Sequence, residues 1–268
     1  MGVLNRAHND GESKMDRRTL LTAAGAAMIA GPARAAWREP DLEKAAARMQ
    51  SWVADGRVQG ASVLVRQRNK AGAHLFSRNY GTATGPEPIF LLASITKPMT
   101  AAAVMTLVDA GKLSLDDHVT KFFPQITGGG RGQITLRHCL THTGGLPDML
   151  PDDEMLRQKH ATLTDFRDGA FKAPLKFKPG TSYSYSSMGI LIASLIAQKI
   201  SGVLFAKFIA DKVFRPLGMT RTSMGLMGLP KNQTVPSQAA PAVTAAGKES
   251  WHDWNWNSDY WRGLGAPW

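Results

Sequence analysis

The segment from Ser94 to Lys97 constrains this chain most, because it combines a reactive pair with the start of a helix. It reads Ser94-Ile95-Thr96-Lys97, is the only S-x-x-K in the sequence, and opens a long apolar helical pattern. Residues three positions apart in a helix share a face, so the hydroxyl and the amine can touch. A Lys near a second cation or in a dry environment loses its proton more easily, which makes the pair a candidate nucleophile with its own base. The same tetrapeptide also arises by chance as a helix cap followed by a solvated Lys, so its interpretation needs partners.

A candidate partner is Tyr185, in the only Y-x-[NS] of the chain, Tyr185-Ser186-Ser187. A Pro-Gly turn at 179–180 precedes it and an apolar helical run at 188–196 follows it. A loop that enters a helix can aim side chains into a cleft, so Tyr185 is a candidate proton relay. A Tyr that packs at a helix entrance and hydrogen-bonds the backbone fits the same pattern.

A third motif, K-x-G or H-x-G on a late strand, does not occur after Tyr185. His142-Thr143-Gly144 has the right letters but lies between Ser94 and Tyr185, and we interpret it as a loop.

Several longer stretches make the sequence look familiar. They are LASITKP at 92–98, GKLSLDD at 111–117, ITLRHCLTHTGGL at 134–146, PGT at 179–181 leading to the Tyr185 motif, and PLGM at 216–219. In this order they resemble the serine β-lactamase and penicillin-binding-protein superfamily, specifically its class C β-lactamase-like branch. That branch includes D-alanyl-D-alanine carboxypeptidases and β-lactamase-related esterases. The resemblance implies an α+β fold, in which an antiparallel sheet flanked by helices is joined to a mostly helical lobe, and a serine hydrolase that needs no cofactor.

The resemblance also implies residue roles. Ser94 would be the acylated nucleophile, Lys97 would help to take its proton, and Tyr185 would relay that proton to the leaving group. Ser187 occupies the position where many relatives have an Asn that contacts the Lys and the substrate amide. A Ser there is shorter and has no amide, so an esterase-like activity is expected more than penicillin hydrolysis.

Acyl transfer also needs two N–H donors for the oxyanion. The backbone N–H of Ser94, at a helix start, is one candidate. In the family the second donor lies on a strand near the C-terminus, whereas this sequence stops at Trp268. The resemblance therefore predicts a C-terminally truncated member with weak or no activity.

Residues 16–36 resemble an export signal, with a twin-Arg start at Arg17-Arg18, an Ala-rich apolar stretch over 20–31, and an A-x-A cleavage site at 33–35. We therefore expect 1–35 to be a signal, 36–268 to be the hydrolase domain, and the location to be periplasmic or secreted. A plain amphipathic N-terminal helix is the alternative.

Other classes of function find little support in the sequence. The net charge is +11, but the Lys and Arg are scattered and no nucleic-acid-binding motif occurs. The spacing of His138 and His142 fits a metalloprotease, but Cys139 stands where that motif has a Glu, so we expect no metal.

Cys139 is the only Cys and is expected to be a small core residue. Asp116 and Asp117 follow a turn and are expected to cap rather than catalyse. No stretch is long and apolar enough for a transmembrane helix.

Hydrophobic periodicity predicts the remaining elements. Strands are expected at 61–66 and 73–80, and helices at 39–56, 94–110, 136–141, 163–171, 188–201 and 204–213. Residues 228–250 lack a period and are expected to be a surface excursion, and the segment from 251 to 268 holds five of the seven Trp.

The sequence thus predicts a serine hydrolase that forms an acyl-enzyme on Ser94 with a small ester, amide or cell-wall peptide. Two alternatives stay open. One is a catalytically weak or dead family member that only binds cell-wall peptide or a protein partner, and the other is a non-functional fragment.

Overall fold

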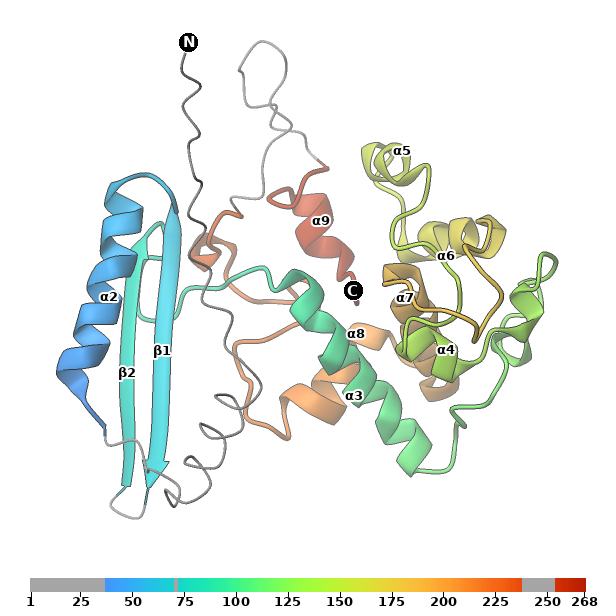
Figure 1. Ribbon diagram of the computed structural model, residues 1–268, viewed down its shortest axis with the longest axis horizontal. Helices are drawn as coiled ribbons and strands as arrows, with labels where there is room; N and C mark the ends of the chain where they lie inside the picture. Colours follow the sequence, from blue (N-terminus) through green and yellow to red (C-terminus); the bar gives the residue numbers. More distant parts are fainter. Residues whose placement is uncertain (1–36, 70–71, 238–253) are drawn as a thin grey trace, which may run out of the picture.

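The structure is a computed structural model that describes residues 37–69, 72–237 and 254–268. The expected export signal and most of the expected excursion after residue 237 lie outside these residues. The chain forms a small sheet layer at one side and a helical lobe at the other, with α3 between them (Figure 1). This is the expected α+β architecture.

The sheet layer consists of one helix on a hairpin. Helix α2 (Glu39–Ala54) lies along strands β1 (Gly60–Asn69) and β2 (Gly72–Gly81), which pair antiparallel with Val65 opposite Phe76. Phe76 is buried, whereas Leu64 and Leu75 on the other face of the hairpin are about two-thirds exposed, at 67% and 63%. The predicted helix and both strands are confirmed, and the strands extend further toward the turn than expected.

The helical lobe is built from short elements around one long apolar helix. Its α-helices are α3 (Thr96–Asp109), α4 (Leu136–Leu140), α5 (Asp153–Gln158), α6 (Leu163–Lys172), α7 (Ser187–Ser201), α8 (Phe205–Ile209) and α9 (Asp259–Leu264).

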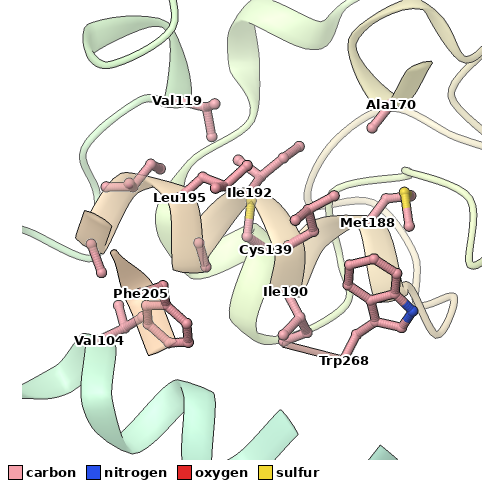
Figure 2. Packing of buried hydrophobic residues seen from close by; sticks show 14 of the residues in the cluster. Val104, Val119, Cys139, Ala170, Met188, Ile190, Ile192, Leu195, Phe205 and Trp268 are labelled. Atoms are coloured by element: carbon pink, nitrogen blue, oxygen red, sulfur yellow. The ribbon is translucent and has the colours of Figure 1, made fainter. Parts of the chain in front are cut away.

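Helix α7 forms the centre of the core. Every residue from 187 to 197 is buried, as expected of a helix that is apolar all round. Side chains from α3, α4, α6 and α8 surround it, together with the last residue, Trp268 (Figure 2). Cys139 of α4 is buried against α7, which confirms its expected core position. In the described part of the chain no single helix is long and apolar enough to cross a membrane, and only a bent pair, Ser187–Ser201 with Phe205–Phe214, meets that length and composition together.

Two predicted elements need correction, and two further helices were not predicted. The helix expected from Ser94 begins as a 3-10 turn, Ala93–Ile95, before α3 starts. The helix expected over 204–213 is divided into α8 and a π-helical turn, Ala210–Phe214, which a period of 3.6 does not predict. Helices α5 and α9 are only six residues each, too short for periodicity to reveal them.

Residues 228–237, which were expected to begin a surface excursion, pair with another part of the chain. Thr234 forms a parallel bridge with Ile89, and Val235 donates a 2.8 Å hydrogen bond to the carbonyl of Ile89. Val235 is buried as a result. This pairing holds the segment that leads to Ser94 against a part of the chain far along the sequence.

Candidate active site

Ser94 lies where the chain passes from the sheet layer into α3. It is exposed, in the middle of the 3-10 turn Ala93–Ile95. The preceding residue, Ala93, has φ 46°, a left-handed conformation that is unfavourable for a residue with a Cβ. Such local strain persists only where the surroundings impose it, and it is concentrated at functional sites.

Lys97 lies in the first turn of α3, and its side chain extends back to the 3-10 turn that contains Ser94. Its Nζ lies 3.0 Å from Oγ of Ser94. Lys97 is the only buried charged residue among those described, at 6% exposed. The expectation that the hydroxyl and the amine share a face and touch is confirmed.

Tyr185 reaches the same place from the loop before α7. Its ring lies 4.6 Å from Nζ of Lys97, within the range of a cation–π contact. The ring is partly exposed, at 38%. The structure therefore brings together Ser94, Lys97 and Tyr185, although the last is far from the first two in the sequence.

Ser187 and its neighbour begin α7 and make different contacts. Both the backbone N–H and the hydroxyl of Ser187 donate to Oδ1 of Asp148, at 2.9 Å and 2.6 Å. The hydroxyl of Ser186 accepts from the N–H of Gly189 and donates to the carbonyl of Pro147, so it caps the helix. Asp148, which no sequence motif indicated, thus fixes the proton of the Ser187 hydroxyl.

His142 is a further neighbour, which from the sequence was expected to lie in a loop and to bind no metal. Its ring centroid lies 4.7 Å from that of Tyr185. Burial, and then the positive charge of Lys97, lowers the pKa of His142, while the charge of Asp148 acts in the opposite direction. The sequence drew attention to this position only because His142-Thr143-Gly144 has the letters of the H-x-G motif. That motif is expected on a late strand, and it does not predict a contact with Tyr185.

A cavity of about 490 Å³ opens beside these side chains. Ser94, Tyr185, Ser187 and Asp148 line one part of it. The remaining wall is largely apolar with three Arg side chains, and includes Phe90, Leu92, Met149, Arg157, Arg221, Trp256, Trp261, Arg262 and Trp268. The cavity can therefore hold a small molecule with an apolar group next to the hydroxyl of Ser94.

The remaining candidate motifs make structural contacts. Nδ1 of His138 accepts from the N–H of Thr135, and Nδ1 of His142 accepts from that of Ser186. Asp117 accepts from the N–H of Ser114, and Asp116 pairs with Arg137, which lowers the pKa of Asp116. Over residues 37–69, 72–237 and 254–268, no group of three or more His, Cys, Asp or Glu is arranged to hold a metal ion.

Comparison with known proteins decides the family. The family described as "Beta-lactamase" matches residues 43–256, which is most of the chain. The chain belongs to this Beta-lactamase family. The resemblance seen in the sequence motifs is thereby confirmed.

Individual known proteins are moderately similar to the chain. Protein flp of Staphylococcus aureus (strain NCTC 8325 / PS 47) is 29% identical over 178 residues, which cover 63% of this chain and 35% of flp. Penicillin-binding protein 4* of Bacillus subtilis (strain 168) is 32% identical over 164 residues, 57% of this chain and 36% of that protein. The chain thus spans about a third of the length of these curated relatives.

A solved structure matches over a larger share. The D-amino acid amidase of Ochrobactrum anthropi SV3, complexed with L-phenylalanine amide, aligns with a TM-score of 0.65 and 25% identity over 85% of this chain and 64% of the amidase. Family and structural relatives together support chemistry of the serine-hydrolase kind.

Proposed function

We propose that this protein is a serine hydrolase that forms an acyl-enzyme on Ser94 with a small ester, amide or peptide. The 3.0 Å contact between Nζ of Lys97 and Oγ of Ser94 carries the proposal, because it joins a nucleophile to a potential base. The ring of Tyr185 over the same Nζ places a phenol beside that pair.

The acylation step follows from these positions. The oxygen of Ser94 attacks the substrate carbonyl carbon as Nζ of Lys97 takes the hydroxyl proton. The phenol of Tyr185 then gives a proton to the leaving alcohol or amine as its bond to the carbonyl carbon breaks. Water releases the acyl group by the reverse proton path. The backbone N–H of Ser94 is the proposed donor to the oxyanion.

Ser187 has a proposed role in holding the substrate. Its hydroxyl proton is directed to Asp148, so the lone pairs of its oxygen remain available to accept from a substrate N–H. A Ser offers less here than an amide side chain, which can both donate and accept. We therefore place esters and simple amides ahead of penicillins as substrates.

An activity-based label tests the proposal. A fluorophosphonate probe should modify the purified protein once, at Ser94 by peptide mass spectrometry, and Ser94→Ala should abolish the label. Ser62→Ala, an exposed Ser on β1, is the matched control and should label as the wild type does. An unlabelled wild type would overturn the proposal. It would favour the alternative function, in which the protein is catalytically weak or dead and only binds cell-wall peptide or a partner.

Turnover is measured separately with a chromogenic ester. Product beyond one equivalent shows that water releases the acyl group, and a single burst shows acylation alone. Either result agrees with an acyl-enzyme on Ser94, whereas release that persists in Ser94→Ala contradicts it.

We also propose export through the twin-Arg segment, based on residues 16–36 alone. Deleting these residues should leave the protein in the cytoplasm of a bacterial host. Unchanged export after the deletion would contradict the proposal.

A further inference from the structure

His142 lies two residues after the end of α4, in a left-handed backbone conformation. Its φ is 60°, in a region that is uncommon for residues other than Gly and in which His, Asn and Asp occur more often than most. The loop 141–145 is therefore fixed in a particular shape, and His142 is half-buried within it.

The backbone on both sides of Tyr185 is hydrogen-bonded to His142. The N–H of Ser184 donates to the carbonyl oxygen of His142 at 3.0 Å. The N–H of Ser186 donates to Nδ1 of the His142 ring at 3.1 Å. One residue thus holds the chain immediately before and immediately after Tyr185.

The hydrogen bond from Ser186 also fixes the state of the imidazole. A backbone N–H can only donate, so Nδ1 must be an acceptor and the ring proton of the neutral form must be on Nε2. Burial and the nearby charge of Lys97 lower the pKa of His142, which keeps the ring neutral near pH 7. Protonation at Nδ1 would remove the acceptor.

The imidazole ring also contacts the side chain of Tyr185. The two rings are 4.7 Å apart between centroids and inclined by 32°, an offset contact of the kind that aromatic pairs favour. Tyr183 meets the same imidazole edge-on at 6.0 Å. Tyr185 is itself partly exposed, so burial alone does not hold its ring in place.

We propose that His142 is a positioning residue that holds the phenol of Tyr185 over Lys97 and Ser94. It does so through two backbone hydrogen bonds that flank Tyr185 and through ring contact with it. This inference rests on the proposed function, because positioning matters only if Tyr185 moves a proton. A small displacement of such a group slows a reaction about 10- to 100-fold.

Two substitutions separate the acceptor from the ring. His142→Phe keeps an aromatic ring and loses the acceptor for the N–H of Ser186. His142→Asn keeps an oxygen acceptor, tolerates the positive φ, and loses the ring. His160→Asn is the matched control, since His160 also has a positive φ, 50°, and its ring stacks on Tyr260 at 4.7 Å. His160 does not line the cavity at Ser94.

The first measurement is the kinetics of fluorophosphonate labelling. For His142→Phe the limiting rate should fall about 10- to 100-fold, while the probe concentration at half-maximal rate stays unchanged. His142→Asn should retain more of the rate than His142→Phe, and His160→Asn should match the wild type. If the wild type labels and both His142 variants label as fast, the inference is overturned.

The second measurement reports the position of Tyr185 without any activity. The chain has four Tyr, so 3-fluorotyrosine gives few fluorine resonances, and Tyr185→Phe identifies the one from Tyr185. That resonance should shift or broaden in His142→Phe and stay fixed in His160→Asn. If His142→Phe does not fold by circular dichroism, His142→Asn is measured in its place. An unchanged resonance in the folded variant overturns the inference, whereas an unlabelled wild type with a shifted resonance overturns only the proposed function.

Discussion

The hydroxyl of Thr100 donates a 2.8 Å hydrogen bond to the carbonyl oxygen of Pro267. The donor lies in α3, one turn after Lys97, and the two partners are 167 positions apart. Thr100 is fully buried, and Trp268 next to Pro267 packs its ring against Phe166. The segment 254–268 therefore rests on the helix that carries Lys97, and its Trp side chains complete the wall of the cavity.

Thr100→Val should destabilise the fold, because it leaves the carbonyl of Pro267 without its partner. An unpaired buried carbonyl costs about 1–3 kcal/mol, while the shape of the side chain is conserved. Urea unfolding followed by circular dichroism measures the change in free energy. Thr106→Val is the control, since the hydroxyl of Thr106 donates to the carbonyl of Ala103 in the same helix. Equal losses in the two variants would show that the contact with Pro267 does not stabilise the fold.

Tyr185→Phe should slow acylation of Ser94 strongly and leave stability nearly unchanged. The ring contacts with Lys97 and His142 remain, but the phenol that passes the proton is lost, a change worth about 10²–10⁴ in rate. Partly exposed positions of this kind shift the free energy of unfolding by about 0.5 kcal/mol or less.

Labelling kinetics and urea unfolding of the same preparation test both parts of this prediction. Tyr183→Phe is the control, because Tyr183 is two residues earlier in the same loop and is 65% exposed. A labelling rate for Tyr185→Phe within about twofold of the wild type would remove Tyr185 from the mechanism.

Which features the sequence revealed depends on how local their causes are. The contact between Ser94 and Lys97 follows from helix geometry within one turn, so the pattern predicted it. Helix α7 followed from its continuous apolar run. The hairpin followed from two short runs with β-branched and aromatic residues on either side of the turn at 67–72.

Contacts between segments that are far apart in the sequence were not predicted. The role of His142 depends on a loop 44 positions away bringing Ser186 to its Nδ1. Asp148 reaches Ser187 across 39 positions. The pairing of Ile89 with Thr234 likewise joins remote parts of the chain. No local propensity encodes these contacts, since each arises only when the core has formed.

Gly189→Ala should destabilise the protein although Ala favours helices. A Cβ on Gly189 would lie 2.9 Å from the carbonyl oxygen of Cys139 and 3.3 Å from its Cα, so α4 and α7 would have to separate. Overpacking of this kind costs about 1–3 kcal/mol, more than the roughly 1 kcal/mol that Ala gains over Gly in a helix. Thermal unfolding provides the measurement.

Gly263→Ala is the matched control for this prediction. Gly263 is also helical, in α9, and nothing lies within 4 Å of its added Cβ. Its substitution should leave the melting temperature unchanged or raise it. If Gly189→Ala is as stable as Gly263→Ala, the close approach of α4 and α7 is not as tight as described.

The thiol of Cys139 should be unreactive in the folded protein. Burial raises its pKa to about 12, and only the thiolate reacts with disulfide reagents. Ellman's reagent at pH 8 should therefore modify the native protein at least about 10³-fold more slowly than the protein in urea.

The same pKa gives a stability prediction with a definite sign. Above the ordinary thiol pKa the unfolded chain loses its proton while the folded chain keeps it, so the folded state binds more protons and the free energy of unfolding falls as the pH rises. From pH 8 to pH 10 the contribution of the thiol should fall by about 1–2 kcal/mol. Other groups also titrate in this range, so the measured quantity is the difference in slope between the wild type and Cys139→Ala in urea unfolding. Parallel slopes would mean that the thiol is not held protonated, and hence that α4 does not seal Cys139 against α7 as tightly as the buried contact requires.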